Sequence, residues 1–129
     1  MADATASLGE TNYAATLTSG RHVLTCDEPV SRGGKDAGPA PYDLLAGSLA
    51  ACTAITLRMY AERKQWPLGS VEVDVHFTRL PDKSSAIDRV LRLSGALTVE
   101  QRARLADIAE RTPVTLTLKS GVEIRTRLE

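Results

Sequence analysis

The chain has 129 residues, sixteen basic and sixteen acidic side chains, and a hydrophobic share of 43%. This length and composition are typical of one folded domain, so we expect a single domain over residues 1–129 and no disordered protein. The zero net charge and an aromatic share of 4% argue against nucleic-acid binding, which draws on excess Lys and Arg or on stacking platforms.

The N-terminal part of the chain predicts a β-hairpin after an irregular leader of about ten residues. Apolar and polar side chains alternate over residues 12–17 and again over 21–26, with the turn signal Thr18-Ser19-Gly20 between them. The next segment, residues 27–41, is rich in Gly and Pro, which excludes a helix or a central strand. It is long for a structureless loop, so we expect it to have a function.

A long helix is predicted from Pro41 to just before Pro67. Proline is favoured in a first helical turn, and Asp43 suits the positive end of the helix dipole. Apolar and small residues recur at helical spacing in a stripe through Leu45, Leu49, Cys52, Thr56 and Met59, widened by Leu44, Ala51 and Ile55. The run AGSLAACTA is small-sided, which favours close packing of another helix inside the domain or across a dimer. We expect this helix to lie at the centre of the fold.

The second half of the chain predicts another hairpin followed by a helix. Alternation indicates strands over residues 71–78 and 88–97, which a short turn connects. Thr98 and Gln101 match a capping box, so a helix is expected over residues 99–111.

The last part of the chain is predicted with one alternative left open. Residues 114–118 fit either a short helix or an extended piece, and residues 122–128 alternate as a final strand. The resulting order is β-β-α-β-β-α-(α)-β. Strands in hairpin pairs separated by helices are typical of an α+β fold with largely antiparallel sheets.

The chain has too few cysteines and histidines for a disulfide framework or a structural zinc site. Cys26 and Cys52 cannot build a disulfide framework, and with His22 and His76 they match no familiar zinc spacing, so we expect no metal and no cofactor. A secretory signal is not visible, and the longest uncharged stretch, residues 44–57, is too short to span a bilayer. We expect a cytoplasmic protein without membrane contact, in which a free cysteine is an inert core residue or a reactive one.

One long segment carries a resemblance to a known family. Residues 33–68, GGKDAGPAPYDLLAGSLAACTAITLRMYAERKQWPL, resemble the OsmC/Ohr family of osmotically inducible and organic hydroperoxide resistance proteins, and its OsmC-like branch most closely. The resemblance implies an OsmC-like fold, an intertwined α+β homodimer with long helices at its centre. It also implies a peroxidase of oxidative-stress defence that reduces organic hydroperoxides through a peroxidatic cysteine. For this chain we expect a single such cysteine, with an external thiol as its reductant.

The resemblance assigns roles to particular side chains. Cys52 matches the peroxidatic cysteine, which attacks the terminal peroxide oxygen and becomes a sulfenic acid. Such a cysteine must react as a thiolate, which requires a nearby cation that lowers its pKa. Arg21 is the best positional match for the family's arginine, and Arg32 is the alternative. Tyr42 or Asp43 would orient that arginine or donate a proton to the departing oxygen.

The same resemblance requires an apolar substrate pocket beside the thiol. An alkyl hydroperoxide binds best among hydrocarbon side chains. Part of the walls would come from the predicted helix, namely Leu44, Leu45, Leu49, Ile55 and Met59.

The chain departs from the peroxidase pattern at two positions. Thr112 stands where the peroxidases carry a resolving cysteine, and Tyr42 stands where they carry a glutamate. A two-cysteine cycle at that pair is therefore excluded. Three alternatives remain: an external thiol reduces the sulfenic acid, Cys26 acts as a substitute resolver, or the activity is weak or absent. The last would fit a non-catalytic OsmC-like dimer that binds a small apolar ligand.

Overall fold

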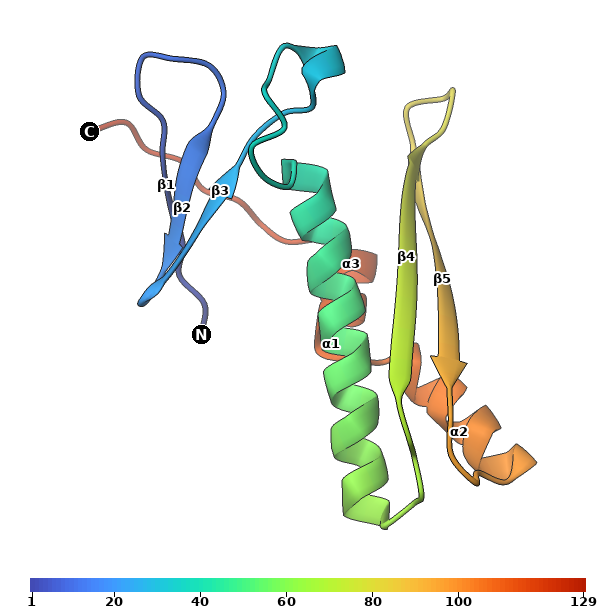
Figure 1. The fold of residues 1–129 in the computed structure, drawn as a ribbon. Coiled ribbons are helices and arrows are strands. Elements are labelled where there is room, and N and C mark those ends of the chain that lie inside the picture. The colour runs from blue at the N-terminus through green and yellow to red at the C-terminus, as the bar shows by residue number, and fades with distance from the viewer. The chain divides into compact units, whose positions relative to one another are not determined.

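The computed structural model describes residues 1–129 as an α+β protein with two antiparallel sheets (Figure 1). In chain order the elements are β1 (Thr5–Ser7), β2 (Ala15–Ser19), β3 (His22–Cys26), the 3₁₀ helix η1 (Val30–Arg32), α1 (Pro41–Lys64), β4 (Val71–Arg79), β5 (Ser85–Leu93), α2 (Val99–Ala109) and α3 (Pro113–Ser120). One sheet has the order β1-β2-β3, and the other is the β4-β5 hairpin. The chain divides into an N-terminal unit, Met1–Leu45, and a C-terminal unit, Ala46–Glu129.

The predicted hairpin of the N-terminal unit is confirmed as β2 and β3. Ser19 pairs with His22 across the turn, and Gly20 in this turn has φ 59°, a conformation that favours glycine. The prediction that the first ten residues are irregular is wrong for Thr5–Ser7, which form β1. This strand pairs antiparallel with β2, and Thr5 lies opposite Thr18. The three residues of β1 are small or polar and carry no visible alternation, so only the open edge of β2 determines their conformation.

The loop after β3 is organised around the buried carboxylate of Asp27. This carboxylate accepts hydrogen bonds from the backbone N–H groups of Glu28 (2.7 Å), Lys35 (3.1 Å) and Ala37 (3.1 Å). Burial acts to raise the pKa of Asp27, but the three N–H donors and the charge of Lys35 outweigh it and hold the pKa below its usual value. The loop is therefore held in one conformation although it contains only a single turn of helix.

Two glycines let this loop fold closely on itself. A Cβ atom at Gly34 would lie 2.0 Å from the carbonyl oxygen of Glu28, and one at Gly38 would lie 2.0 Å from the carbonyl oxygen of Thr25. No side chain fits at these distances. The glycines that argued against a helix in this segment therefore allow its backbone to pack closely.

The long helix predicted from Pro41 is confirmed as α1. At its start the carboxylate of Asp43 accepts the backbone N–H of Ala40 at 3.0 Å, which satisfies a donor ahead of the first turn. At its end Gln65 adopts φ 57°, and Pro67 follows two residues later, where a helix cannot continue.

The face of α1 that is buried differs from the predicted stripe. Its buried side chains are spaced by four residues and are Leu49, Thr53, Leu57 and Ala61. The stripe through Cys52, Thr56 and Met59 is the wrong face, because α1 carries apolar and small residues on several sides and the periodicity alone does not select one. Met59 is 58% exposed and Ile55 is 54% exposed.

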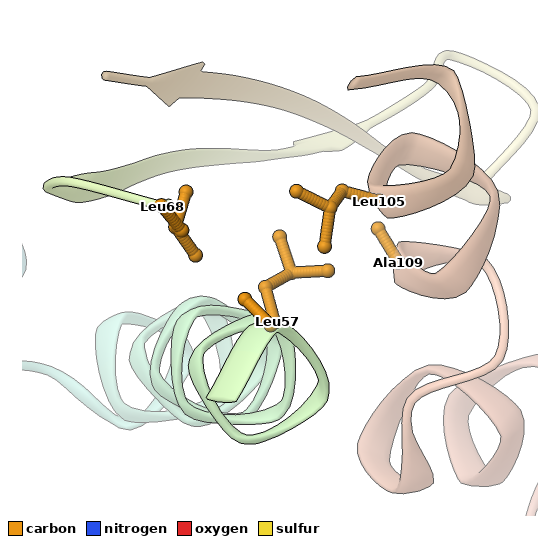
Figure 2. Close-up of a cluster of buried hydrophobic side chains, with 5 residues drawn as sticks. Leu57, Leu68, Leu105 and Ala109 are labelled. Atoms are coloured by element: carbon orange, nitrogen blue, oxygen red, sulfur yellow. The ribbon is translucent and has the colours of Figure 1, made fainter. Parts of the chain in front are cut away.

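The hydrophobic core of the C-terminal unit lies between α1, α2 and the segment that follows α1. Figure 2 shows Leu57 of α1 directed toward Leu105 and Ala109 of α2, with Leu68 beside them. Full burial of a leucine side chain contributes about 1.5–3 kcal/mol. The half-buried side chains packed around this core are Tyr60, Trp66, Val71, Leu91, Leu93, Leu97 and Ile108.

The second hairpin and the helix after it are confirmed as β4, β5 and α2. β5 spans Ser85–Leu93, so it begins three residues before the predicted 88–97 and ends four residues earlier; beyond it Gly95 has φ 106°, outside the strand region. Thr98 and Gln101 form the predicted capping box, each bonding the other's backbone N–H at 3.0 Å. α2 ends at Ala109, two residues before the predicted end.

The C-terminal residues resolve one alternative and contradict one prediction. The ambiguous stretch after Pro113 is helix α3. The predicted final strand over residues 122–128 is wrong for the single chain, because residues 121–129 form neither helix nor strand. A strand needs a neighbour for its N–H and C=O groups, and β4 and β5 pair only with each other. The observed order is therefore β-β-β-α-β-β-α-α.

Candidate functional site

Cys52 is the twelfth residue of α1, near the middle of the helix, and is a free, half-buried thiol. Its Sγ lies 4.0 Å from the hydroxyl of Thr56. Residues three, four and seven positions further share a helical face, so Cys52, Ile55, Thr56 and Met59 form one surface. We call these four residues the thiol face. It is apolar apart from the hydroxyl, and Ile55 and Met59 are exposed.

The other predicted pocket residues take different positions on α1. Leu49 belongs to the buried row that faces the core, at 4% exposed. Leu44 and Leu45 are half-buried and belong to the N-terminal unit. Of the predicted pocket residues, only Ile55 and Met59 thus lie on the thiol face. Both side chains are exposed in the single chain.

The predicted polar partners of the thiol belong to the N-terminal unit. Arg21 lies in the β2–β3 turn and Arg32 at the end of η1, and both side chains are exposed. Tyr42 and Asp43 lie in the first turn of α1, where Tyr42 is exposed and Asp43 caps the helix through Ala40. Cys26, the proposed substitute resolver, ends β3 as a free, half-buried thiol of the same unit.

A buried cluster of threonine hydroxyls around Arg89 lies on the other side of the cysteine-bearing turn. Arg89 is on the inward face of β5, with 13% of its side chain exposed. Its Nη1 donates to the hydroxyl of Thr53 at 3.0 Å and to that of Thr115 at 2.9 Å. The hydroxyl of Thr112 lies 2.6 Å from that of Thr115. We call Arg89, Thr53, Thr112 and Thr115 the threonine cluster.

The backbone carbonyls next to the threonine cluster determine which hydroxyl donates each hydrogen bond. Thr53 donates to the carbonyl of Leu49 at 2.7 Å, and Thr115 donates to the carbonyl of Ala109 at 3.3 Å. Each hydroxyl has one hydrogen, so both oxygens only accept from Arg89, and Thr112 donates to Thr115. All the buried side-chain oxygens of the cluster are satisfied, which is the condition for burying polar groups.

Two further charges extend the cluster toward solvent. Glu110 lies 3.6 Å from Nη2 of Arg89 and 3.0 Å from Nζ of Lys119. The hydrogen bond and charge of Lys119, and then the charge of Arg89, hold the pKa of Glu110 below its usual value against the opposing effect of burial. The guanidinium of Arg89 thus has a carboxylate on its exposed side and hydroxyls on its buried side.

Sequence reasoning missed Arg89, Thr53 and Thr115. A signal for the first was present, because Arg89 interrupts an alternating apolar face between Ile87 and Leu91. Thr53 and Thr115 gave no signal, since threonine fits many positions on a helix. Thr112 was noted only as a missing cysteine, and the structure places it fully buried within the cluster.

No group of three or more His, Cys, Asp or Glu side chains is arranged to hold a metal ion. Helix α1 is long and apolar enough to cross a membrane by length and composition, a test that core helices of water-soluble proteins also pass. Arg58 of α1 donates to the carbonyls of Leu68 and Gly69, so that part of the helix is bonded within the C-terminal unit.

Solved structures from several organisms share this fold. An OsmC-like protein from Mycoplasma pneumoniae gives a TM-score of 0.79 at 23% identity, over 92% of this chain and 87% of that one. An organic hydroperoxide resistance protein OsmC from Legionella pneumophila gives 0.66 at 22% identity, over 92% and 89%. The organic hydroperoxide resistance protein OhrB of Bacillus subtilis gives 0.63 at 24% identity, over 95% and 93%. The protein is therefore an α+β protein with the OsmC-like fold.

The family follows from the sequence itself. Residues 33–127 match the family model described as OsmC-like protein, which covers most of the chain. The chain belongs to the OsmC family. No curated protein matches it.

Proposed function

We propose that this protein is a thiol-dependent peroxidase that reduces organic hydroperoxides through Cys52. The observation that carries the proposal is a free cysteine on a helical face with exposed apolar side chains, Ile55 and Met59, within the residues that match the family model. Several structural neighbours are named organic hydroperoxide resistance proteins, which supports the same activity.

The proposed reaction uses one cysteine and an external reductant. The Cys52 thiolate attacks the terminal oxygen of the hydroperoxide, so an S–O bond forms and the O–O bond breaks. The electron pair of the broken bond leaves on the alkoxide, which takes up a proton and becomes an alcohol. One external thiol condenses with the sulfenic acid, releasing water, and a second thiol frees Cys52 as the external disulfide forms.

Polar partners of the reaction are assigned as part of the proposal. Arg21 supplies the cation that favours the thiolate, with Arg32 as the alternative. Tyr42 donates to the departing oxygen or, with Asp43, orients the arginine. We assign the reaction to the cytoplasm, where reduced thiols are available as the reductant.

The proposal includes a homodimer that covers the thiol face. Exposed apolar side chains of this kind mark interaction surfaces when they are contiguous. The C-terminal segment supports a second copy as the occupant: Val122, Ile124 and Leu128 alternate with charged residues, as in a strand, but have no neighbouring strand within the chain. A partner sheet would supply that neighbour.

The test of the peroxidase is oxidation of Cys52 at stoichiometric oxidant. The Cys26→Ser protein is treated with one equivalent of cumene hydroperoxide, and the sulfenic acid is captured with dimedone and located by mass spectrometry. We expect an adduct at Cys52, its removal by a dithiol before capture, and slower oxidation by hydrogen peroxide. An unmodified Cys52 ends the proposal, and the Cys52→Ser protein provides the background.

A second candidate function is a non-catalytic dimer that binds a small apolar ligand. The buried hydrogen-bonded position of Thr112 favours it, because no second thiol is available there. The pH dependence of Cys52 alkylation separates the two functions. A midpoint well below about pH 7 supports the peroxidase, and one near about pH 8.5 supports the binding protein.

A further inference from the structure

Arg89 is a permanent charge on the inward side of β5. The neighbouring inward positions, Ile87 and Leu91, are apolar, and an apolar residue at position 89 would avoid the cost of removing a guanidinium from water. Its bonds to two neutral hydroxyls and a carboxylate 3.6 Å away offset only part of that cost. We therefore expect Arg89 to have a role other than packing in the core.

Arg89 is bonded to the residue that follows the proposed nucleophile. Thr53 both donates to the carbonyl of Leu49 and accepts from Arg89, so its side chain is held in one rotamer. Successive helical residues are rotated by about 100° around the axis. Holding Thr53 toward β5 therefore directs the side chain of Cys52 toward the thiol face, where its Sγ meets Thr56.

We propose that Arg89 is a positioning residue for the Cys52 thiol. Through Thr53 it holds the cysteine-bearing turn of α1 in one rotation, and it keeps a fixed positive charge against that turn. Thr115 of α3 accepts a hydrogen bond from the same guanidinium nitrogen, and Thr112, the residue before α3, donates to Thr115. The inference rests on the proposed function of Cys52, and it gives the buried Thr112 a structural role in place of a second thiol.

The experiment compares variants at Thr53 and Thr115 in the Cys26→Ser protein. Thr53→Val removes the bond between Arg89 and α1, and Thr53→Ser keeps it. Thr115→Val removes the other hydroxyl bond of Arg89 and leaves α1 attached. The readouts are the rate of Cys52 oxidation by cumene hydroperoxide, the pH midpoint of iodoacetamide alkylation, and Tm. Glu110 and Lys119, the other charged groups of the cluster, stay constant throughout.

We expect Thr53→Val to slow oxidation by about tenfold and to raise the alkylation midpoint by about half a pH unit. Thr53→Ser should restore both values. Thr115→Val should lower Tm as much as Thr53→Val while its oxidation rate stays within about twofold of the parent, since a loss of stability alone does not redirect the thiol. The inference is overturned if Thr53→Val is oxidised at the rate of the parent, or if Thr115→Val is slowed as much as Thr53→Val.

Failure of the inference can be told from failure of the proposed function. If the parent forms no sulfenic acid but Thr53→Val still shifts the alkylation profile and Thr53→Ser restores it, the peroxidase proposal fails and the positioning role stands. If the parent is oxidised and Thr53→Val behaves like the parent in both assays, the peroxidase stands and the positioning role fails.

Discussion

Arg89 donates a 3.0 Å hydrogen bond to the hydroxyl of Thr53, which joins strand β5 to the helical turn that carries Cys52. The same nitrogen donates to Thr115, so one guanidinium bonds to both α1 and α3. The guanidinium of Arg89 thus forms a polar region inside the C-terminal unit. The buried core cluster of the same unit consists of leucine and alanine side chains.

The two arginines of β5 allow a matched test of this arrangement. Arg89 points inward, whereas Arg92 points outward and pairs with Glu72 at 2.8 Å and with Asp74 at 2.5 Å. Arg89→Ala should lower the free energy of unfolding by about 2–4 kcal/mol, because it leaves a cavity and two hydroxyls without a donor. Arg92→Ala should cost at most about 1 kcal/mol, as exposed ion pairs do. Urea unfolding measures both, and equal losses would contradict the structure.

The leucine at the centre of the core is the second test. Leu57→Ala should lower the free energy of unfolding by about 2–5 kcal/mol, because Leu57 is fully buried against α2 and its removal leaves a cavity. Glu62→Ala, at an exposed position five residues further along α1, should stay within about 0.5 kcal/mol. Chemical denaturation provides the comparison, and a small loss at Leu57 would mean that α1 packs by another face.

The proposed dimer is tested on the thiol face. Met59→Asp places a charge on the exposed apolar surface of α1 and should convert a dimer into monomers, since an unpaired charge in an interface is costly. Light scattering after size exclusion measures the mass. Lys83→Asp changes charge in the exposed turn between β4 and β5, outside the thiol face, and should leave the mass unchanged. A parent that is monomeric at all concentrations, or a Met59→Asp dimer, rules out this interface.

The Asp27 loop should make stability depend on pH. The pKa of Asp27 is lowered in the folded state from its model-peptide value of 3.8, so its ionised form stabilises the fold above that value. The contribution is lost as the pH falls through the lower, folded-state pKa. The difference in Tm between the parent and Asp27→Asn should be constant above about pH 5 and shrink below about pH 4. Asp88→Asn, exposed on β5, is the control. A difference that grows in acid would mean the opposite sign of shift.

Local patterns were enough to predict most of the elements. Pro41, Asp43 and the apolar residues after them predict α1, and Thr98 with Gln101 predicts the start of α2, because these features act within one or two turns. Alternation predicts β4 and β5 for the same reason. Cys52 was singled out through the resemblance of residues 33–68 to the OsmC/Ohr family and not through a local pattern.

Long-range partners decided the rest, and no local pattern contains them. The buried face of α1 depends on which side α2 and the β4–β5 hairpin occupy, so the row with Thr53 is buried and the row with Met59 is exposed. β1 exists because β2 has an open edge, and residues 122–128 have alternation but no strand to pair with. The sequence by itself determined where α1, β4 and α2 begin. Only the tertiary structure decided which faces are buried and that Arg89 meets Thr53, because these depend on residues 36 positions apart in the chain.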